Sequence, residues 1–153
     1  MTQSQARSGI TNYLPISDTL ATAGQPAAEH FPVIRAAGFK VVVNLAMPTS
    51  TDALPNEGEL VAAQGMEYVH IPVVWEAPTA EDLERFFAVM DRNRGWKVLV
   101  HCALNMRVSC FVFLYRVLRL GTPAPEAWQD VLAIWEPNEV WQRFVDEMLE
   151  KGT

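Results

Sequence analysis

The sequence KVLVHCALNMRVSCFVFLYR, residues 97–116, joins a short apolar run to a predicted turn and then to a second, longer apolar run. Residues 98–100 are apolar with two β-branched members, which predicts a buried strand. A six-residue turn follows His101 and Cys102, and Ser109 is expected to open a helix over residues 110–120. Cys102 would then lie near unpaired backbone N–H groups and the positive end of a helix dipole.

Arg107, five residues after Cys102, adds a guanidinium group to this predicted turn. Positive surroundings favour the thiolate, which is the nucleophilic form of cysteine. The turn's N–H groups and a guanidinium fork can also hold a tetrahedral oxyanion. The stretch therefore predicts a nucleophile, Cys102, beside an anion site. The predicted phosphate-binding residues are His101, Ala103, Leu104, Asn105, Met106, Arg107 and Val108.

The order of motifs along the chain resembles a known family. His-Cys, a short loop, Arg and then Ser is similar to the phosphate-binding loop of the cysteine-dependent protein phosphatases. Three other segments occur in the order of a bacterial branch of that superfamily: TAGQP at 22–26, GFKVVVNL at 38–45 and YVHIPV at 68–73. The branch is that of dual-specificity-phosphatase-like domains, including those fused to beta-lactamase-like hydrolases, and the resemblance covers roughly residues 10–120.

The resemblance implies roles for single residues in the hydrolysis of phosphomonoesters. Cys102 would attack phosphorus and form a phosphocysteine, and Arg107 would grip two phosphate oxygens. His101 would orient the loop, and the hydroxyl of Ser109 would ease departure of the thiolate in the second step. This covalent chemistry needs no metal or other cofactor. The implied partner is a phosphorylated substrate or a small oxyanion such as phosphate or sulfate.

A phosphatase of this kind also needs a general acid for the leaving oxygen. The family places an aspartate on the loop after the strand that ends in His-Ile-Pro. Here that loop reads VVWEAP at 73–78, and Glu76 is its only carboxylate. Asp82 is expected in the first turn of the next helix, so Glu76 is the candidate acid.

The cysteine loop departs from the usual superfamily pattern. Four residues separate Cys102 from Arg107, where five with a glycine among them are usual. A ring of N–H groups needs unusual backbone dihedrals, and Asn105 is the residue of this loop that tolerates them best. Two other functions therefore stay open: a non-catalytic module that binds phosphate or a phosphorylated ligand, and sulfur transfer of the rhodanese-like kind.

The remaining segments predict an α/β fold. A short strand is expected at 20–23 among turn residues, and further strands at 40–45 and 66–73. Helices are expected at 27–37, 57–64 after Asn56, 80–94 after Thr79, 125–134 and 138–151. Alternating strands and helices predict a mainly parallel sheet of four to five strands flanked by helices. Residues 1–9 are expected to form a flexible tail, and residues 10–153 a single phosphatase-like domain.

Composition limits the classes of partner. The chain has 153 residues, of which 50% are hydrophobic and 20% charged, with a net charge of −6. An acidic balance argues against nucleic acid or an anionic membrane as the main partner. The two cysteines are eight residues apart around one helix start and are not expected to pair, which favours the cytoplasm. No metal-ligand spacing, Walker loop or dinucleotide fingerprint occurs.

Overall fold

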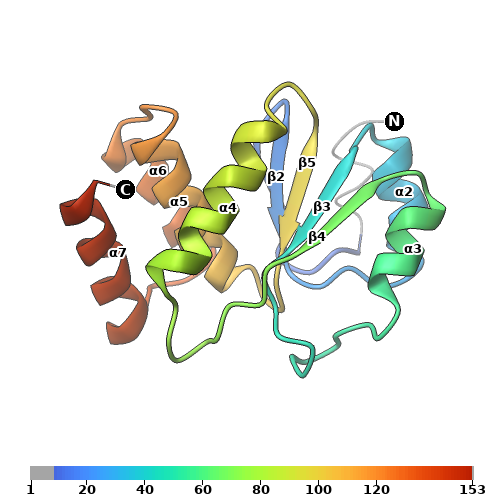
Figure 1. Ribbon diagram of the computed structural model, residues 1–153, viewed down its shortest axis with the longest axis horizontal. Coiled ribbons are helices and arrows are strands. Elements are labelled where there is room, and N and C mark those ends of the chain that lie inside the picture. The colour runs from blue at the N-terminus through green and yellow to red at the C-terminus, as the bar shows by residue number, and fades with distance from the viewer. Residues whose placement is uncertain (1–8, 153) are drawn as a thin grey trace.

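A computed structural model describes residues 9–152 of the chain (Figure 1). The strands of its sheet are β1 (Leu14–Ser17), β2 (Leu20–Ala23), β3 (Val41–Asn44), β4 (Glu67–His70) and β5 (Val98–His101). The helices are α2 (His30–Ala36), α3 (Glu57–Ala63), α4 (Ala80–Arg92), α5 (Met106–Leu118), α6 (Ala124–Leu132) and α7 (Glu139–Lys151). The predicted flexible tail falls almost wholly on residues 1–8, which lie outside the described part.

The five strands form one sheet in the order β1-β2-β5-β3-β4. β2, β5, β3 and β4 run parallel, as the sequence predicts, and β1 pairs antiparallel with β2 at one edge. β1 falls among residues expected to be turn. Pro15 fits there because an edge strand can lack one N–H donor, and the register shifts beside it. β5 pairs on both sides, so the strand that leads into Cys102 is central.

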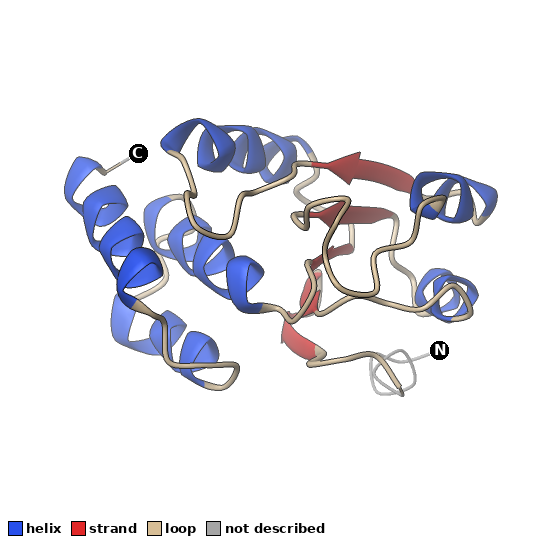
Figure 2. Cartoon of the chain, turned by 90° about the horizontal axis from the view of Figure 1, so that it is seen from below, coloured by secondary structure: helices blue, strands red, loops and turns tan. Residues whose placement is uncertain are grey.

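Helices cover both faces of the sheet, with α2 and α3 on one side and the other four on the opposite side (Figures 1 and 2). Side chains of one strand alternate between the two cores. Val41 and Val43 join the core under α4 and α5, whereas Val42 joins the core under α2. The three consecutive valines are thus buried on both faces of the sheet.

The same alternation separates the two residues at the end of β5. Leu99 and His101 lie on the side of α2 and α3, and Val100 and Cys102 lie on the side of α4 and α5. His101 therefore faces one core and Cys102 the other. The Cys102 site has a different set of neighbours on each face of the sheet.

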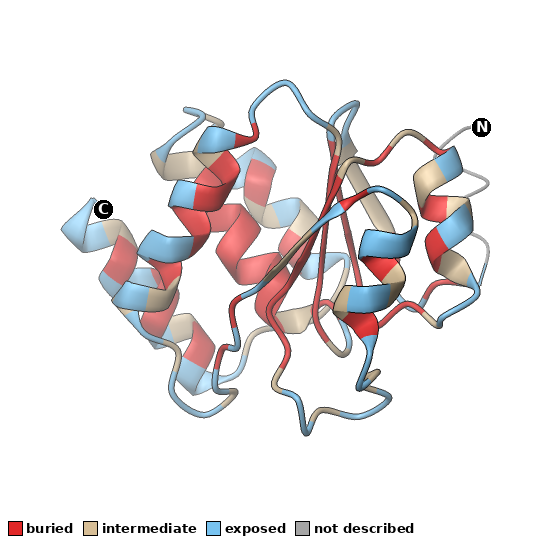
Figure 3. Cartoon of the chain, turned by 45° about the vertical axis from the view of Figure 1, so that its right-hand side comes forward, coloured by how far each residue is buried: buried red, intermediate tan, exposed pale blue. Residues whose placement is uncertain are grey.

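Helix α5 is buried almost all round (Figure 3), in agreement with its sequence. Its start differs from the prediction, because the helix begins at Met106 and not after Ser109. Asn105 occupies the N-cap position with a left-handed backbone, φ 70°. Its side-chain amide donates to the carbonyl of Asn12 and the hydroxyl of Thr22, each at 2.9 Å. The expectation that Ser109 caps the helix is therefore wrong.

The other helix boundaries agree with the sequence to within a few residues. Thr79 caps α4 as predicted, since its hydroxyl accepts from the N–H of Asp82 at 3.1 Å. Asn56 precedes α3, but its side chain makes no capping bond, so that expectation is wrong. Helix α2 begins at His30 instead of residue 27, because residues 27–30 form a turn.

The two C-terminal helices pack through aromatic rings. Trp128 of α6 lies 5.0 Å from Phe113, and Phe144 of α7 lies 5.8 Å from Phe111, measured between ring centroids. Trp135 and Trp141 lie 5.4 Å and 5.9 Å from the ring of Trp75 on the loop before α4, and the indole N–H of Trp141 donates to the Trp75 carbonyl at 2.9 Å. The C-terminal helices therefore fix the loop that carries Glu76.

Replacement of Asn105 tests the left-handed start of α5. Asn105→Gly and Asn105→Ala both remove the two side-chain hydrogen bonds, but only alanine places a Cβ in the left-handed conformation. Asn105→Ala should therefore unfold with a free energy about 1 kcal/mol lower than that of Asn105→Gly. Urea unfolding of the two variants measures the difference, and equal stabilities would show that the backbone there is not left-handed.

Cys110 tests the burial of α5. Burial raises the pKa of this thiol to about 12, and the nearby Cys102 acts in the same direction, whereas a hydrogen bond with Ser109 lowers it. The folded-state pKa of the Cys110 thiol lies above that of an exposed thiol, which is about 8.5. The stabilising contribution of Cys110 to the free energy of unfolding is therefore complete below about pH 8.5 and is lost as the pH rises toward the folded-state pKa.

Alkylation with iodoacetamide at about pH 8 should accordingly leave Cys110 unmodified in the folded protein and modify it in urea. Peptide mass spectrometry reads each cysteine separately. Modification of Cys110 at the unfolded rate under native conditions would contradict its burial.

Candidate active site

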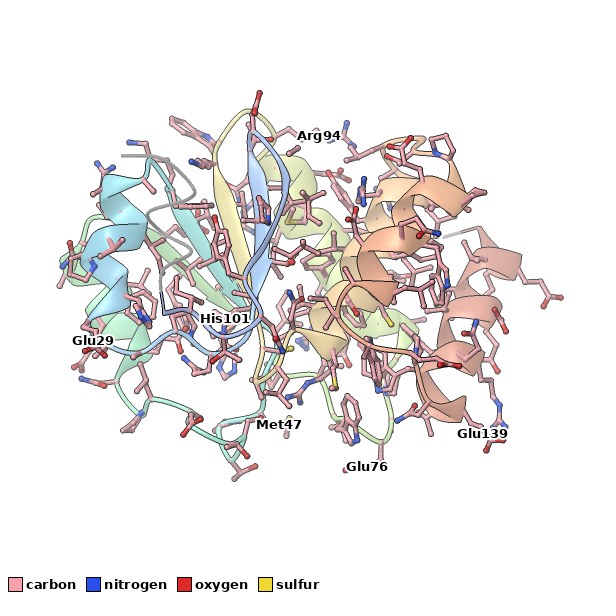
Figure 4. The ribbon with its side chains drawn as sticks, turned by 180° about the vertical axis from the view of Figure 1, so that it is seen from behind. Glu29, Met47, Glu76, Arg94, His101 and Glu139 are labelled. Atoms are coloured by element: carbon pink, nitrogen blue, oxygen red, sulfur yellow. The ribbon has the colours of Figure 1, made fainter. Side chains whose placement is uncertain are left out.

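The predicted turn lies at the carboxyl end of the parallel strands. His101 ends β5, and Figure 4 shows it at the same end of the sheet as Met47 and Glu76, whereas Arg94 lies at the opposite end. The loops after β3 and β4 therefore meet the loop after β5. Such an edge is where ligands bind in open α/β sheets.

Hydrogen bonds hold the carbonyl groups of the turn on one side. The carbonyl oxygen of Cys102 lies 3.3 Å from Nδ1 of His101, and that of Ala103 accepts from the N–H of Gln25 at 3.0 Å. In a trans peptide the C=O and N–H groups point in opposite directions. The N–H groups of Ala103 and Leu104 therefore point away from these partners, in the direction an anion cradle requires.

Residues before β2 and after it hold the turn from behind. The carbonyl of Leu104 accepts from the side-chain amide of Asn12 at 3.0 Å. Gly24 passes so close that an added Cβ would lie 2.6 Å from the carbonyl oxygen of Ala103 and 3.1 Å from Thr11. The glycine of the TAGQP segment thus permits the close approach that fixes the turn.

Cys102 and Arg107 line one pocket. Its volume is about 150 Å³, and it is lined by Trp75, Cys102, Ala103, Leu104, Met106 and Arg107. Cys102 is only 1% exposed and also contacts the core under α4 and α5. The structure therefore brings the predicted nucleophile and the predicted guanidinium together in one small pocket.

The Arg107 guanidinium is held by two neighbouring loops. Its Nη1 donates to the Val73 carbonyl at 3.1 Å and its Nη2 to the Ser50 hydroxyl at 3.3 Å, and its Cζ lies 5.9 Å from the ring centroid of Trp75. These bonds use two of the five N–H donors of a guanidinium. Arginine is thereby fixed at the pocket with donors left for a ligand.

Glu76 belongs to a wider opening next to the cysteine pocket. This opening, about 380 Å³, is lined by Met47, Thr49, Ser50, Thr51, Val74, Trp75, Glu76, Ala103 and Arg107. Arg107 and Trp75 line both openings, which makes them neighbours. Glu76 is exposed and shares the wider opening with Arg107, but it does not line the pocket of Cys102.

The Ser109 side chain forms its hydrogen bonds outside the pocket that contains Cys102. Its hydroxyl donates to the Met106 carbonyl at 2.6 Å and accepts from the indole N–H of Trp135 at 2.9 Å. Val108 is fully buried beside it. Neither side chain lines the pocket that holds Cys102 and Arg107. Of these two residues, only the backbone N–H of Val108, in the first turn of α5, belongs to the predicted cradle.

A buried carboxylate that the sequence did not reveal lies behind the turn. Glu57, at the start of α3, is 3% exposed, and its Oε2 lies 2.5 Å from Nε2 of His101. Its Oε1 accepts from the amide of Gln25 at 2.8 Å, and that amide also donates to the Pro26 carbonyl. Sequence alone marks Glu57 only as an acidic residue in a first helical turn; the one local signal is Val61, buried on the same helix face.

Tyr68 on β4 is the neighbouring titratable group. Burial raises its pKa to about 12; a hydrogen bond with Asn44 lowers it, and the negative charge of Glu57 raises it further. The Asn44 amide donates to the tyrosine oxygen at 3.0 Å. A polar layer thus lies behind the turn, on the face opposite Cys102. Among the described residues no group of three or more His, Cys, Asp or Glu side chains could hold a metal ion.

Comparison with known proteins relates the chain to a family of phosphatases. The family model of the DSP-PTPase phosphatase fused to NAD+ kinase matches residues 7–134. A beta-lactamase hydrolase-like protein of Agrobacterium fabrum is 33% identical over 106 residues, and one of Xylella fastidiosa is 29% identical. These matches cover 67% of this chain but only 24% of each relative, so the chain spans about a quarter of their length.

Solved structures resemble more than nine-tenths of the chain. A DUF442 protein from Shewanella putrefaciens CN-32 has 40% sequence identity and a TM-score of 0.82, covering 94% of this chain and 92% of its own. The active form of Tk-PTP has a TM-score of 0.77 at 22% identity, covering 91% of this chain and 97% of its own, which shows a shared fold. Within residues 9–152, no helix is both long and apolar enough to cross a membrane. With a matching fold and a cysteine-arginine pocket at the expected edge of the sheet, the chain belongs to the DSP-PTPase family of phosphatases.

Proposed function

We propose that this protein hydrolyses phosphomonoesters through a phosphocysteine intermediate on Cys102. The observation that carries the proposal is that Cys102 and Arg107 line the same pocket. The turn between them has the carbonyl groups of Cys102 and Ala103 held by His101 and Gln25, which directs the next N–H groups away from these partners. The substrate class is phosphotyrosine, phosphoserine or a small phosphorylated molecule. Exposed Val74 and Leu104 offer apolar surface beside these openings for the body of such a substrate.

In the first step the Cys102 thiolate attacks phosphorus, the S–P bond forms and the bond from phosphorus to the leaving oxygen breaks. Glu76 donates a proton to that oxygen. The remaining donors of Arg107 and the N–H groups of residues 103–108 bind the equatorial oxygens, where negative charge is spread in the transition state.

In the second step water attacks the phosphocysteine. The S–P bond breaks, inorganic phosphate leaves and the thiolate is restored, with Glu76 now accepting the proton of the water. The sequence resemblance also gives Ser109 the task of easing thiolate departure. Its hydroxyl would have to exchange the Met106 carbonyl for the sulfur in order to do so.

Turnover of an aryl phosphate tests the nucleophile. Cys102→Ser should abolish turnover, because the alcohol is not ionised at neutral pH, and Arg107→Lys should lower kcat/KM by about 10²-fold, because lysine cannot replace the guanidinium fork. Cys110→Ala is the matched control and should retain activity. Mass spectrometry of the quenched wild-type enzyme should show phosphate on Cys102.

Two other results would replace this proposal. Thermal stabilisation by phosphate without any turnover would identify a non-catalytic phosphate-binding module. Transfer of sulfur from thiosulfate to cyanide, dependent on Cys102, would identify a sulfurtransferase.

The leaving group tests Glu76. An alkyl phosphate needs a proton on its leaving oxygen, whereas a nitrophenolate leaves without one. Glu76→Gln should therefore lower kcat about 10²-fold or more for an alkyl phosphate and much less for p-nitrophenyl phosphate. Glu81→Gln, which changes an exposed carboxylate in the first turn of α4, is the control. An equal loss on both substrates would exclude Glu76 as the acid.

A further inference from the structure

Both ring nitrogens of His101 face acceptors. Nδ1 lies 3.3 Å from the carbonyl oxygen of Cys102, which cannot donate, so Nδ1 carries a proton in that hydrogen bond. Nε2 lies 2.5 Å from Oε2 of Glu57. One further proton must therefore lie between the ring and the carboxyl group, and the two side chains together form either an ion pair or a neutral pair.

The surroundings of Glu57 favour the ion pair. A carboxylate accepts hydrogen bonds at both oxygens, and here Oε1 accepts from Gln25 while Oε2 lies within hydrogen-bond distance of the ring nitrogen Nε2. Both side chains are buried, at 3% exposed for Glu57 and fully for His101. A buried charge needs a hydrogen-bonded partner of opposite sign, and each supplies it to the other.

We infer that Glu57 is a positioning residue for the nucleophile: it keeps His101 as an imidazolium whose Nδ1–H holds the Cys102 carbonyl. This inference rests on the proposed role of Cys102. Since the carbonyl is held behind the turn, the N–H of Ala103 is turned toward the anion. The imidazolium also places a fixed positive charge next to the residue whose sulfur must ionise.

The charges around His101 are few. Glu57 faces it from α3, and Tyr68 of β4 lies near Glu57 but stays un-ionised at neutral pH, because its pKa is raised to about 12. Arg107 of α5 lies on the other side of the turn, bonded to Val73 and Ser50. Without Glu57 no carboxylate bonded to the buried ring remains among the described residues, so the ring would lose its second proton.

The test compares Glu57→Gln with Glu59→Gln. Both remove one carboxylate from helix α3, but Glu59 lies two residues after Glu57, about half a helical turn away, and is exposed. The readout is the ultraviolet absorbance of the Cys102 thiolate against pH, taken as the difference from a Cys102→Ala background. Cys110 does not interfere at neutral pH, because burial raises its pKa to about 12.

Glu57→Gln should raise the midpoint of thiolate formation by about one pH unit or more, because the imidazolium is lost. Glu59→Gln should leave the midpoint unchanged. A wild-type midpoint below that of an ordinary thiol, combined with an unchanged or lower midpoint in Glu57→Gln, would overturn this inference and leave the proposed function standing. A wild-type midpoint like that of an ordinary thiol would instead remove the nucleophile on which the proposed function depends.

A double variant covers the case in which Glu57→Gln does not fold. His101→Gln combined with Glu57→Gln contains no buried charge at this position and can form an amide–amide hydrogen bond. Its midpoint should be raised like that of the single variant. A double variant that titrates as the wild type does would overturn the inference.

Discussion

The site depends on the direction in which the peptide groups after β5 point. Each peptide has one donor and one acceptor on opposite sides, so fixing the carbonyl also fixes the N–H. His101 and the N–H of Gln25 take the carbonyls of Cys102 and Ala103. The absence of a side chain at Gly24 allows β2 to come close enough for this. The N–H groups of Ala103 and Leu104 are therefore directed away from these partners without any glycine inside the loop.

The two faces of β5 give the site two kinds of surroundings. Behind the turn lies a buried polar layer with Glu57, Gln25 and Tyr68; on the other face Cys102 adjoins an apolar core and a narrow pocket. The polar layer reaches the cysteine through His101, whose Nδ1 lies 3.3 Å from the Cys102 carbonyl oxygen. The β-strand alternation that separates His101 from Cys102 is what makes this division possible.

Packing far from the turn also shapes the opening. Trp135, on the loop between α6 and α7, and Trp141 of α7 contact the ring of Trp75, and the indole N–H of Trp141 also donates to the Trp75 carbonyl. Trp75 in turn lies beside the Arg107 guanidinium and lines both openings. The segment from α6 to α7 therefore supports the loop of Glu76, although it supplies none of the lining residues of the two openings.

The sequence by itself determined the features that depend on neighbours along the chain. The valine run of β3, the Thr79 cap and the apolar α5 follow from residue types within a few positions of each other, because burial periodicity and capping are local. The closeness of Cys102 and Arg107 follows from their spacing, and the left-handed conformation of Asn105 agrees with its tolerance for that region.

Only the tertiary structure decided the contacts between distant residues. Glu57 meets His101 across 44 residues, and the side-chain amide of Asn105 is bound by Asn12 and Thr22, which moves the start of α5 to Met106. Ser109 looks like a cap in sequence, yet its hydroxyl contacts Met106 and Trp135. The order of the strands in the sheet decides which of these distant segments become neighbours. The propensities of single residues and their sequence neighbours do not contain that information.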